Sequence, residues 1–119
     1  MKKLKEGISH AKFYNGKAKI SKLELVKEKD SAKILEFKRA RICFHQNDKD
    51  KIHEMIITFH KDSYIRPHKH LSKSESYLVL EGEIEIIFFN DVGEIKKRVL
   101  LSDYNSGNSF YMKSINEEW

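Results

Sequence analysis

Runs of β-branched and aromatic residues, separated by short turn-forming segments, fill the chain from Lys33 onward. Such runs are typical of strands, and they predict strands near residues 33–45, 53–60, 65–70, 76–80, 83–89, 94–101 and 109–113. The segments between them are short enough for hairpins, and the clearest turn is Asn90-Asp91-Val92-Gly93. Because no helical pattern separates these strands, the sequence predicts an all-β fold, a small antiparallel barrel.

The first 32 residues carry a weaker signal than the remainder of the chain. The segment Ser21–Lys33 is either a short amphipathic helix or a frayed strand, because its few apolar residues fit both periods. The total length of 119 residues fits one domain. We therefore expect a short helical or irregular N-terminal arm over residues 1–32 and a barrel domain over residues 33–119.

The net charge and the hydropathy of the sequence limit which partners and which compartment we expect for this protein. The 23 basic and 18 acidic residues give a net charge of +5, but the lysines are scattered among glutamates, which indicates a solvated surface and no nucleic-acid partner. No stretch approaches the roughly 18 apolar residues of a membrane span, and no signal peptide is evident. The single cysteine, Cys43, agrees with a reducing compartment. We expect a cytoplasmic protein without membrane insertion.

The first long predicted strand has one polar face and one apolar face. One face carries Arg39, Arg41, Cys43 and His45, and the other carries Ala40, Ile42 and Phe44. If the polar face points into a barrel, it must line a cavity that holds water, metal or ligand, because unpaired buried charge is costly. If it points outward, it is ordinary surface.

Two histidines and a glutamate form the most informative motif. His68 and His70 are separated by one residue, so on a strand their imidazoles project from the same face. Glu75 opens the next predicted strand and can join them, and Gly82 closes a tight turn beyond it. Two imidazoles and a carboxylate suit a divalent transition metal, namely zinc, manganese, iron or nickel.

This motif resembles a known family signature. The spacing His-x-His, four residues, Glu, six residues, Gly is that of the first signature of the cupin superfamily. The residues around it resemble the WbuC-type cupin-fold metalloproteins, which are bacterial proteins associated with O-antigen and other surface-polysaccharide gene clusters. The resembling segments are Arg39-Ala40-Arg41-x-Cys43-x-His45, His53-Glu54-Met55, Asp62 to His70 and Lys73-Ser74-Glu75-Ser76. The resemblance implies a cupin-type jelly-roll barrel with the metal inside.

The resemblance also implies an incomplete site. The second cupin signature supplies one more metal-binding histidine, and the sequence ends at Trp119, where that histidine is expected next. A barrel without its last strands has an unpaired edge that another molecule must cover. We therefore expect a homodimer in which the sheets pair about a twofold axis.

Five further side chains are candidates for chemistry around the metal: Glu54 and Tyr77 as catalytic groups, and Arg41, Arg66 and His53 as ligand-binding groups. The arginines, with Arg39, either clamp an anion or are solvated or paired with glutamates. His45 and His53 flank one loop and are either structural or near the metal site, where one could be a substitute ligand or a donor that orients a metal ligand. Tyr77 is either an acid–base group or half-buried packing.

The leading hypothesis is a cupin-fold metalloprotein that binds a small polar or anionic ligand. The resemblance implies a sugar or sugar nucleotide of surface-polysaccharide biosynthesis, and a Lewis-acid metal favours isomerisation or epimerisation. Two alternatives stay open. A site of two histidines and a carboxylate also suits a non-haem iron oxygenase, and a weak or vestigial metal site suits a non-catalytic binding or assembly module.

Overall fold

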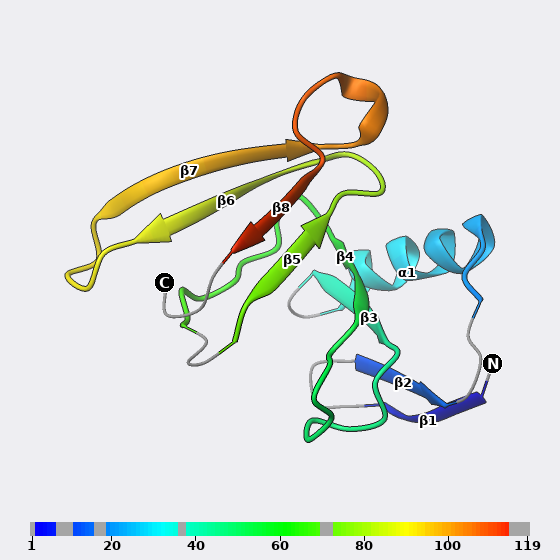
Figure 1. Ribbon diagram of the computed structural model, residues 1–119. Helices are drawn as coiled ribbons and strands as arrows, with labels where there is room; N and C mark the ends of the chain where they lie inside the picture. Colours follow the sequence, from blue (N-terminus) through cyan, green and yellow to red (C-terminus); the bar gives the residue numbers. More distant parts are fainter. Residues whose placement is uncertain (1, 7–10, 16–18, 36–37, 70–72, 115–119) are drawn as a thin grey trace. The chain divides into compact units, whose positions relative to one another are not determined.

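The computed structural model describes every residue except 1, 7–10, 16–18, 36–37, 70–72 and 115–119 (Figure 1). The chain divides into two compact units, Met1–Ile65 and Arg66–Trp119. The described secondary structure is mostly β, with mainly antiparallel strand pairs and one α-helix, which confirms the predicted predominance of strands. In this described part of the chain, no helix has the length and apolar character that a membrane span needs.

The first unit contains a four-stranded sheet and the helix. Its elements are β1 (Lys2–Glu6), β2 (Ala11–Asn15), α1 (Lys22–Ile34), β3 (Arg39–Cys43) and β4 (Met55–Phe59). The strands lie in the order β1-β2-β3-β4, and β2 pairs with β3 in parallel whereas the other pairs are antiparallel. Parallel neighbours need a crossover connection, which α1 provides. The predicted N-terminal arm is thus helical in part, but it also supplies two strands of the sheet.

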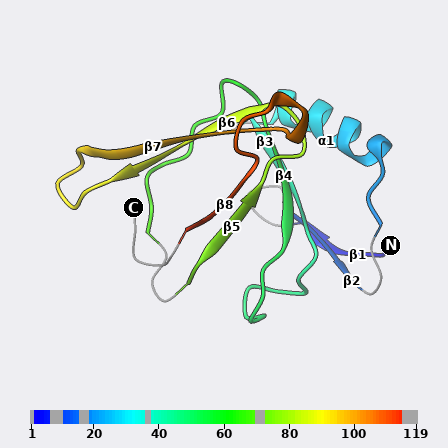
Figure 2. The same ribbon diagram turned by 45° about the horizontal axis from the view of Figure 1, so that its top comes forward.

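Helix α1 begins with a capping box and packs on the sheet. The Glu24 carboxylate accepts the backbone N–H of Ser21 at 2.8 Å and also its hydroxyl. The hydroxyl bond, followed by backbone hydrogen bonds, holds the pKa of Glu24 below its usual value. The helix contacts β3 and β4 (Figure 2). Glu28 and Ala32, one turn apart, are its buried residues.

The two faces of strand β3 differ in burial: one is fully buried and the other is partly buried. Ala40 and Ile42 are each 2% exposed, whereas Arg39 and Arg41, which alternate with them, are partly exposed. Cys43 follows on the arginine face, where it is 1% exposed and packs against Met55 of β4. The predicted polar face is therefore shielded around Cys43 and more open at the arginines.

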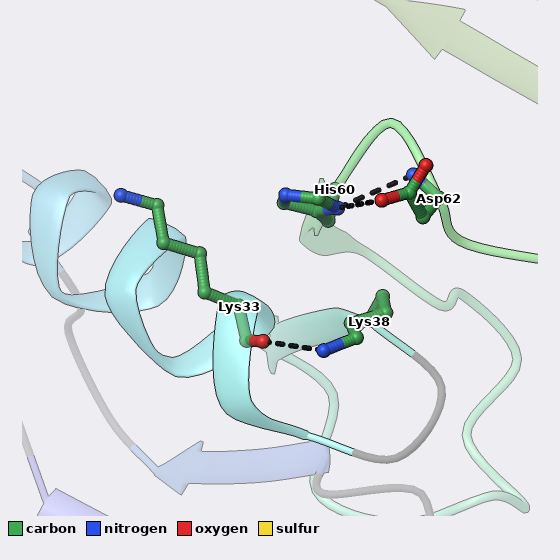
Figure 3. Close-up of polar contacts among 4 residues, drawn as sticks. All are labelled: Lys33, Lys38, His60 and Asp62. Carbon is green, nitrogen blue, oxygen red and sulfur yellow. Dashed lines mark hydrogen bonds and ion pairs between the residues drawn. The ribbon is translucent and has the colours of Figure 1, made fainter.

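The chain changes direction between α1 and β3. The strand predicted to begin at Lys33 is wrong in its first part, because α1 continues to Ile34 and β3 begins at Arg39. Lys38 adopts a left-handed φ of 55°, and its Nζ donates to the carbonyl of Lys33 at 2.7 Å (Figure 3). Its carbonyl accepts the N–H of His60 at 2.8 Å. These bonds join the end of α1 to the end of β4.

The second unit contains two separate two-stranded sheets. Its elements are β5 (Glu75–Leu78), β6 (Glu83–Phe89), β7 (Ile95–Ser102), the 3-10 helix η1 (Tyr104–Ser106) and β8 (Tyr111–Ser114). β5 pairs with β8 and β6 with β7, both antiparallel. The Val79 N–H donates to the Phe110 carbonyl and the Asp103 N–H to the Gly82 carbonyl, each at 3.0 Å. Leu101 of β7 is fully buried.

The β6–β7 hairpin follows the sequence prediction closely. The strands predicted at residues 83–89 and 94–101 lie at 83–89 and 95–102. In the turn between them, the Asn90 side-chain oxygen accepts the N–H groups of Val92 and Glu94 at 3.1 and 2.9 Å. Gly93 has a φ of 87°, which a residue without Cβ adopts readily. The predicted turn is therefore confirmed.

The strand predicted at residues 65–70 is wrong over residues 65–69, which form no ladder. Pro67 lies in the middle of this segment, lacks an N–H donor and restricts the residue before it. The described strands form one four-stranded and two two-stranded sheets and no closed barrel. The cupin-type barrel therefore stays a prediction.

Candidate functional site

The predicted metal ligands belong to the second unit. His68 is exposed in the segment that leads into β5, and its Nδ1 lies 3.0 Å from the carbonyl oxygen of Arg66. Glu75 is the first residue of β5 and is partly buried. His70 lies outside the described residues. Among the residues that are described, no three His, Cys, Asp or Glu side chains form a group that could hold a metal ion. The three-ligand site stays a prediction.

Tyr77 is a hydrogen-bond partner of Glu75. The two residues are next-nearest neighbours on β5, so their side chains project from one face, and the Tyr77 hydroxyl donates to Glu75 Oε2. Burial, followed by this hydrogen bond and the carboxylate charge, raises the pKa of Tyr77. Tyr77 therefore stays protonated in neutral solution and acts as a donor that orients the carboxylate.

The segment before β5 also contacts the β6–β7 turn. Lys69, between the two motif histidines, has its Nζ 4.0 Å from Asp91 Oδ1. The Lys69 side chain is 25% exposed, whereas that of Asp91 is 85% exposed. Arg66, predicted to bind a ligand, is exposed in the same segment. The second unit thus places Arg66 and His68 on an irregular backbone that this ion pair links to the hairpin.

In the first unit, His45 and His53 stack on each other. Their ring centroids are 4.2 Å apart with an interplanar angle of 10°. The His45 Nδ1 lies 3.3 Å from the Glu54 carbonyl oxygen, and the His53 Nε2 lies 3.1 Å from that of Asp48. His45 is buried, whereas His53 and Glu54 are exposed. The stacked rings therefore lie at the two ends of the loop of residues 46–52.

Arg41 lies beside Arg39 on β3, opposite Ile57 of β4. Its Nε is buried and has no hydrogen-bond partner in the described part of the chain. Cys43 is the next residue on this face, and burial raises the pKa of its thiol more than the charge of Arg41 lowers it. This face therefore combines guanidinium charge with a neutral thiol.

The candidate residues form one set in each unit. The first unit holds Arg41, His53 and Glu54, and the second holds Arg66, His68, Glu75 and Tyr77. Sequence reasoning missed the bond between Tyr77 and Glu75, although their spacing of two on a predicted strand was a usable signal. It also missed the His45–His53 stack, for which the only signal was their place at the two ends of one loop.

Comparison with known protein families assigns the chain to one family. A family model described as a domain of unknown function (DUF6016) matches residues 20–101, which is more than half of the 119 residues. The chain belongs to this family. No curated protein and no solved structure matches it. The matched range contains every candidate residue named above.

Proposed function

We propose that this member of the DUF6016 family binds a divalent transition metal through His68, His70 and Glu75. The observation that supports this best is the hydrogen bond from the Tyr77 hydroxyl to the Glu75 carboxylate. Carboxylates that ligate metals are themselves hydrogen-bonded, and such partners orient them for the metal. Glu75 has this partner in a partly buried position, five residues after His70 in the sequence.

The chemistry of the donor set fits zinc, manganese, iron or nickel. Imidazole and carboxylate groups both ligate these ions, and three protein ligands leave positions for water or substrate. A metal bound there would supply Lewis-acid polarisation of a carbonyl or hydroxyl group. The role of Tyr77 is to hold the Glu75 carboxylate, because its raised pKa keeps the hydroxyl proton in place.

The proposed ligand is a small polar or anionic molecule, such as a sugar or sugar nucleotide of surface-polysaccharide biosynthesis. The proposed reaction is isomerisation or epimerisation, supported by the resemblance to WbuC-type cupins. Arg66 is an exposed cation two residues before His68, which suits contact with an anionic group. Tyr77 keeps its proton and is proposed to act through the Glu75 carboxylate that it holds. Glu54 is proposed as a base in the first unit. Arg41 and His53 are the proposed ligand contacts of the first unit.

A cupin-type barrel, a homodimer and a cytoplasmic location belong to the same proposal. The two two-stranded sheets of the second unit support further strand pairing, because isolated two-stranded sheets are marginally stable. The exposed apolar side chains Leu78 and Tyr111 lie opposite each other on the β5–β8 sheet and suit an interface with a second copy.

Metal titration tests this proposal. Calorimetry on chelator-stripped protein should show one zinc or nickel ion per chain, and His70→Gln or Glu75→Gln should weaken binding at least about tenfold. His60→Gln is the matched control, because His60 is a histidine outside the predicted ligand set and its Nδ1 accepts the N–H of Asp62. Bound iron together with oxygen uptake would favour the non-haem iron oxygenase over the proposed isomerase. A chain that binds no divalent metal would contradict the proposal.

A further inference from the structure

Two arginines share one face of β3, opposite the face that carries the buried Ala40. Arg39 and Arg41 are two residues apart, so their Cα atoms are about 6.6 Å apart and their side chains project together. In the antiparallel register with β4, they lie opposite Phe59 and Ile57. Both side chains are partly buried, and both Nε atoms are shielded from solvent. Two like charges are thus held near each other on a partly apolar surface.

The charge of Arg41 is not neutralised within the described residues. Arg41 forms no ion pair there, and its buried Nε donates to no group. Arg39 has contacts that include a bond from Nη1 to the Tyr64 carbonyl at 3.3 Å. Burial lowers the pKa of Arg39, and the neighbouring charge of Arg41 lowers it further. The partly buried Arg41 guanidinium, whose Nε donates to no described group, favours an added negative charge.

The next residue on this face does not supply that charge. Cys43 is 1% exposed, and burial raises the pKa of its thiol. The thiol is therefore neutral in neutral solution and neither pairs with Arg41 nor competes with an anion. Any counter-charge for the arginines has to come from a group other than Cys43.

We propose that Arg39 and Arg41 form a binding site for a phosphoryl group, with the Arg41 guanidinium as its principal contact. The group is either free phosphate or the phosphate end of an ester. This inference deepens the proposed ligand binding and rests on that proposal for the expectation of an anionic ligand. It does not depend on the metal centre.

A phosphoryl group matches this pair of arginines better than a carboxylate does. One guanidinium takes both oxygens of a carboxylate in a bidentate pair, so a carboxylate would engage Arg41 alone. A phosphate monoester carries three acceptor oxygens and nearly two negative charges at neutral pH. Two guanidiniums on one strand face can therefore bind separate oxygens of one tetrahedral group. The partly buried Ile57 beside Arg41 lowers the local dielectric constant and strengthens the attraction.

Calorimetric titration of metal-free protein with inorganic phosphate, and separately with phenyl phosphate, tests the site at pH 7.5 and constant ionic strength. The variant Arg41→Met keeps the apolar stem and removes the guanidinium, and Arg41→Lys keeps the charge without the planar fork. Arg98→Met is the matched control, because Arg98 is an exposed arginine of β7 that pairs with Glu85. Binding of the ester but not of free phosphate would identify the ester as the source of the group.

We expect saturable phosphoryl binding that weakens at least about tenfold in Arg41→Met, severalfold in Arg41→Lys and less than twofold in Arg98→Met. Without phosphate, Arg41→Met should unfold at the same temperature as the wild type or higher, because repulsion of Arg39 is removed. Absence of saturable binding, or unchanged affinity in both Arg41 variants, would overturn the inference. So would a loss of stability confined to Arg41→Met, which would reveal a carboxylate partner for Arg41.

The metal proposal and this inference fail in different ways. Phosphoryl binding that persists in a chain unable to bind metal would sustain the arginine site and contradict the metal centre. Phosphoryl binding that occurs only after zinc is added, and that Arg41→Met leaves unchanged, would place the anion at the metal and overturn the arginine site.

Discussion

Removal of one oxygen atom by Tyr77→Phe tests the geometry of β5. In the folded protein the Tyr77 hydroxyl donates to the Glu75 carboxylate, and both residues are partly buried. Hydrogen bonds to charged groups contribute about 1.5–3 kcal/mol, and solvent around a partly buried pair places this bond near the lower end. We expect Tyr77→Phe to lower the free energy of unfolding by about 1.5 kcal/mol at pH 7.

The pH dependence of this loss of stability identifies the Tyr77 hydroxyl more specifically than the size of the loss does. Burial, the Glu75 hydrogen bond and the carboxylate charge raise the pKa of Tyr77 in the folded protein above its ordinary value near 10. Below about pH 10 its stabilising contribution is fully present, because tyrosine is protonated in both states. As pH rises further, the unfolded chain releases this proton first, and wild-type stability falls by at most about 1.4 kcal/mol per pH unit.

Urea unfolding of metal-free protein between pH 7 and 11 measures this effect. The stability gap between wild type and Tyr77→Phe should narrow above pH 10, because phenylalanine has no proton to release. Tyr111→Phe is the matched control on the paired strand β8, where an exposed hydroxyl donates to Ser76 at 3.1 Å. We expect it to change stability by less than about 0.5 kcal/mol at pH 7. A gap that stays constant from pH 7 to 11 would refute the reasoning.

Two further predictions concern buried side chains. Leu101→Ala should lower the free energy of unfolding by about 3 kcal/mol in urea titrations, because Leu101 is fully buried, whereas Leu100→Ala, at a neighbour that is 45% exposed, should cost less than about 1 kcal/mol. Equal losses would contradict this burial. The Cys43 thiol should react with Ellman's reagent far more slowly in the native protein than in urea, because burial shields it and raises its pKa. Rapid labelling of the native protein would show that Cys43 is open to solvent.

Features fixed by short-range interactions were predictable from the sequence. The β6–β7 hairpin is one, because Asn90 bonds to the backbone of its own turn and Gly93 adopts the left-handed φ that the turn needs. The strand alternation that placed Arg39 and Arg41 on one face of β3 is another. Both depend on residues within a few positions of one another.

Features fixed by long-range pairing were not predictable in the same way. Residues 1–32 showed no clear period. Nevertheless, Ala11–Asn15 form a strand that pairs in parallel with β3, and α1 connects the two strands along the chain. Helix α1 itself was ambiguous because its few apolar residues fit both a helical and a strand period, although Ser21 and Glu24 have the spacing of a capping box. The irregular path at Pro67 was missed for a local reason, because the alternating histidines suggested a strand and the restriction by Pro67 was not weighed.

For the candidate site, the sequence indicated the residue types better than their contacts. The motif of His68, His70 and Glu75 was visible as a spacing, whereas the orientation of Glu75 depends on the Tyr77 hydroxyl. The His45–His53 stack depends on the path of the loop between them, which spacing alone does not determine. The Tyr77–Glu75 contact therefore follows from spacing on one strand, whereas the His45–His53 stack follows from tertiary geometry.

X-ray absorption spectroscopy of zinc-loaded protein tests the proposed metal centre most directly. The proposal predicts scattering from two imidazoles at about 2.0–2.1 Å and from carboxylate oxygen. It further predicts that His70→Gln removes one imidazole from that shell, while His60→Gln leaves the shell unchanged. A zinc shell without imidazole, or one that His70→Gln does not alter, would contradict a metal site built from His68, His70 and Glu75.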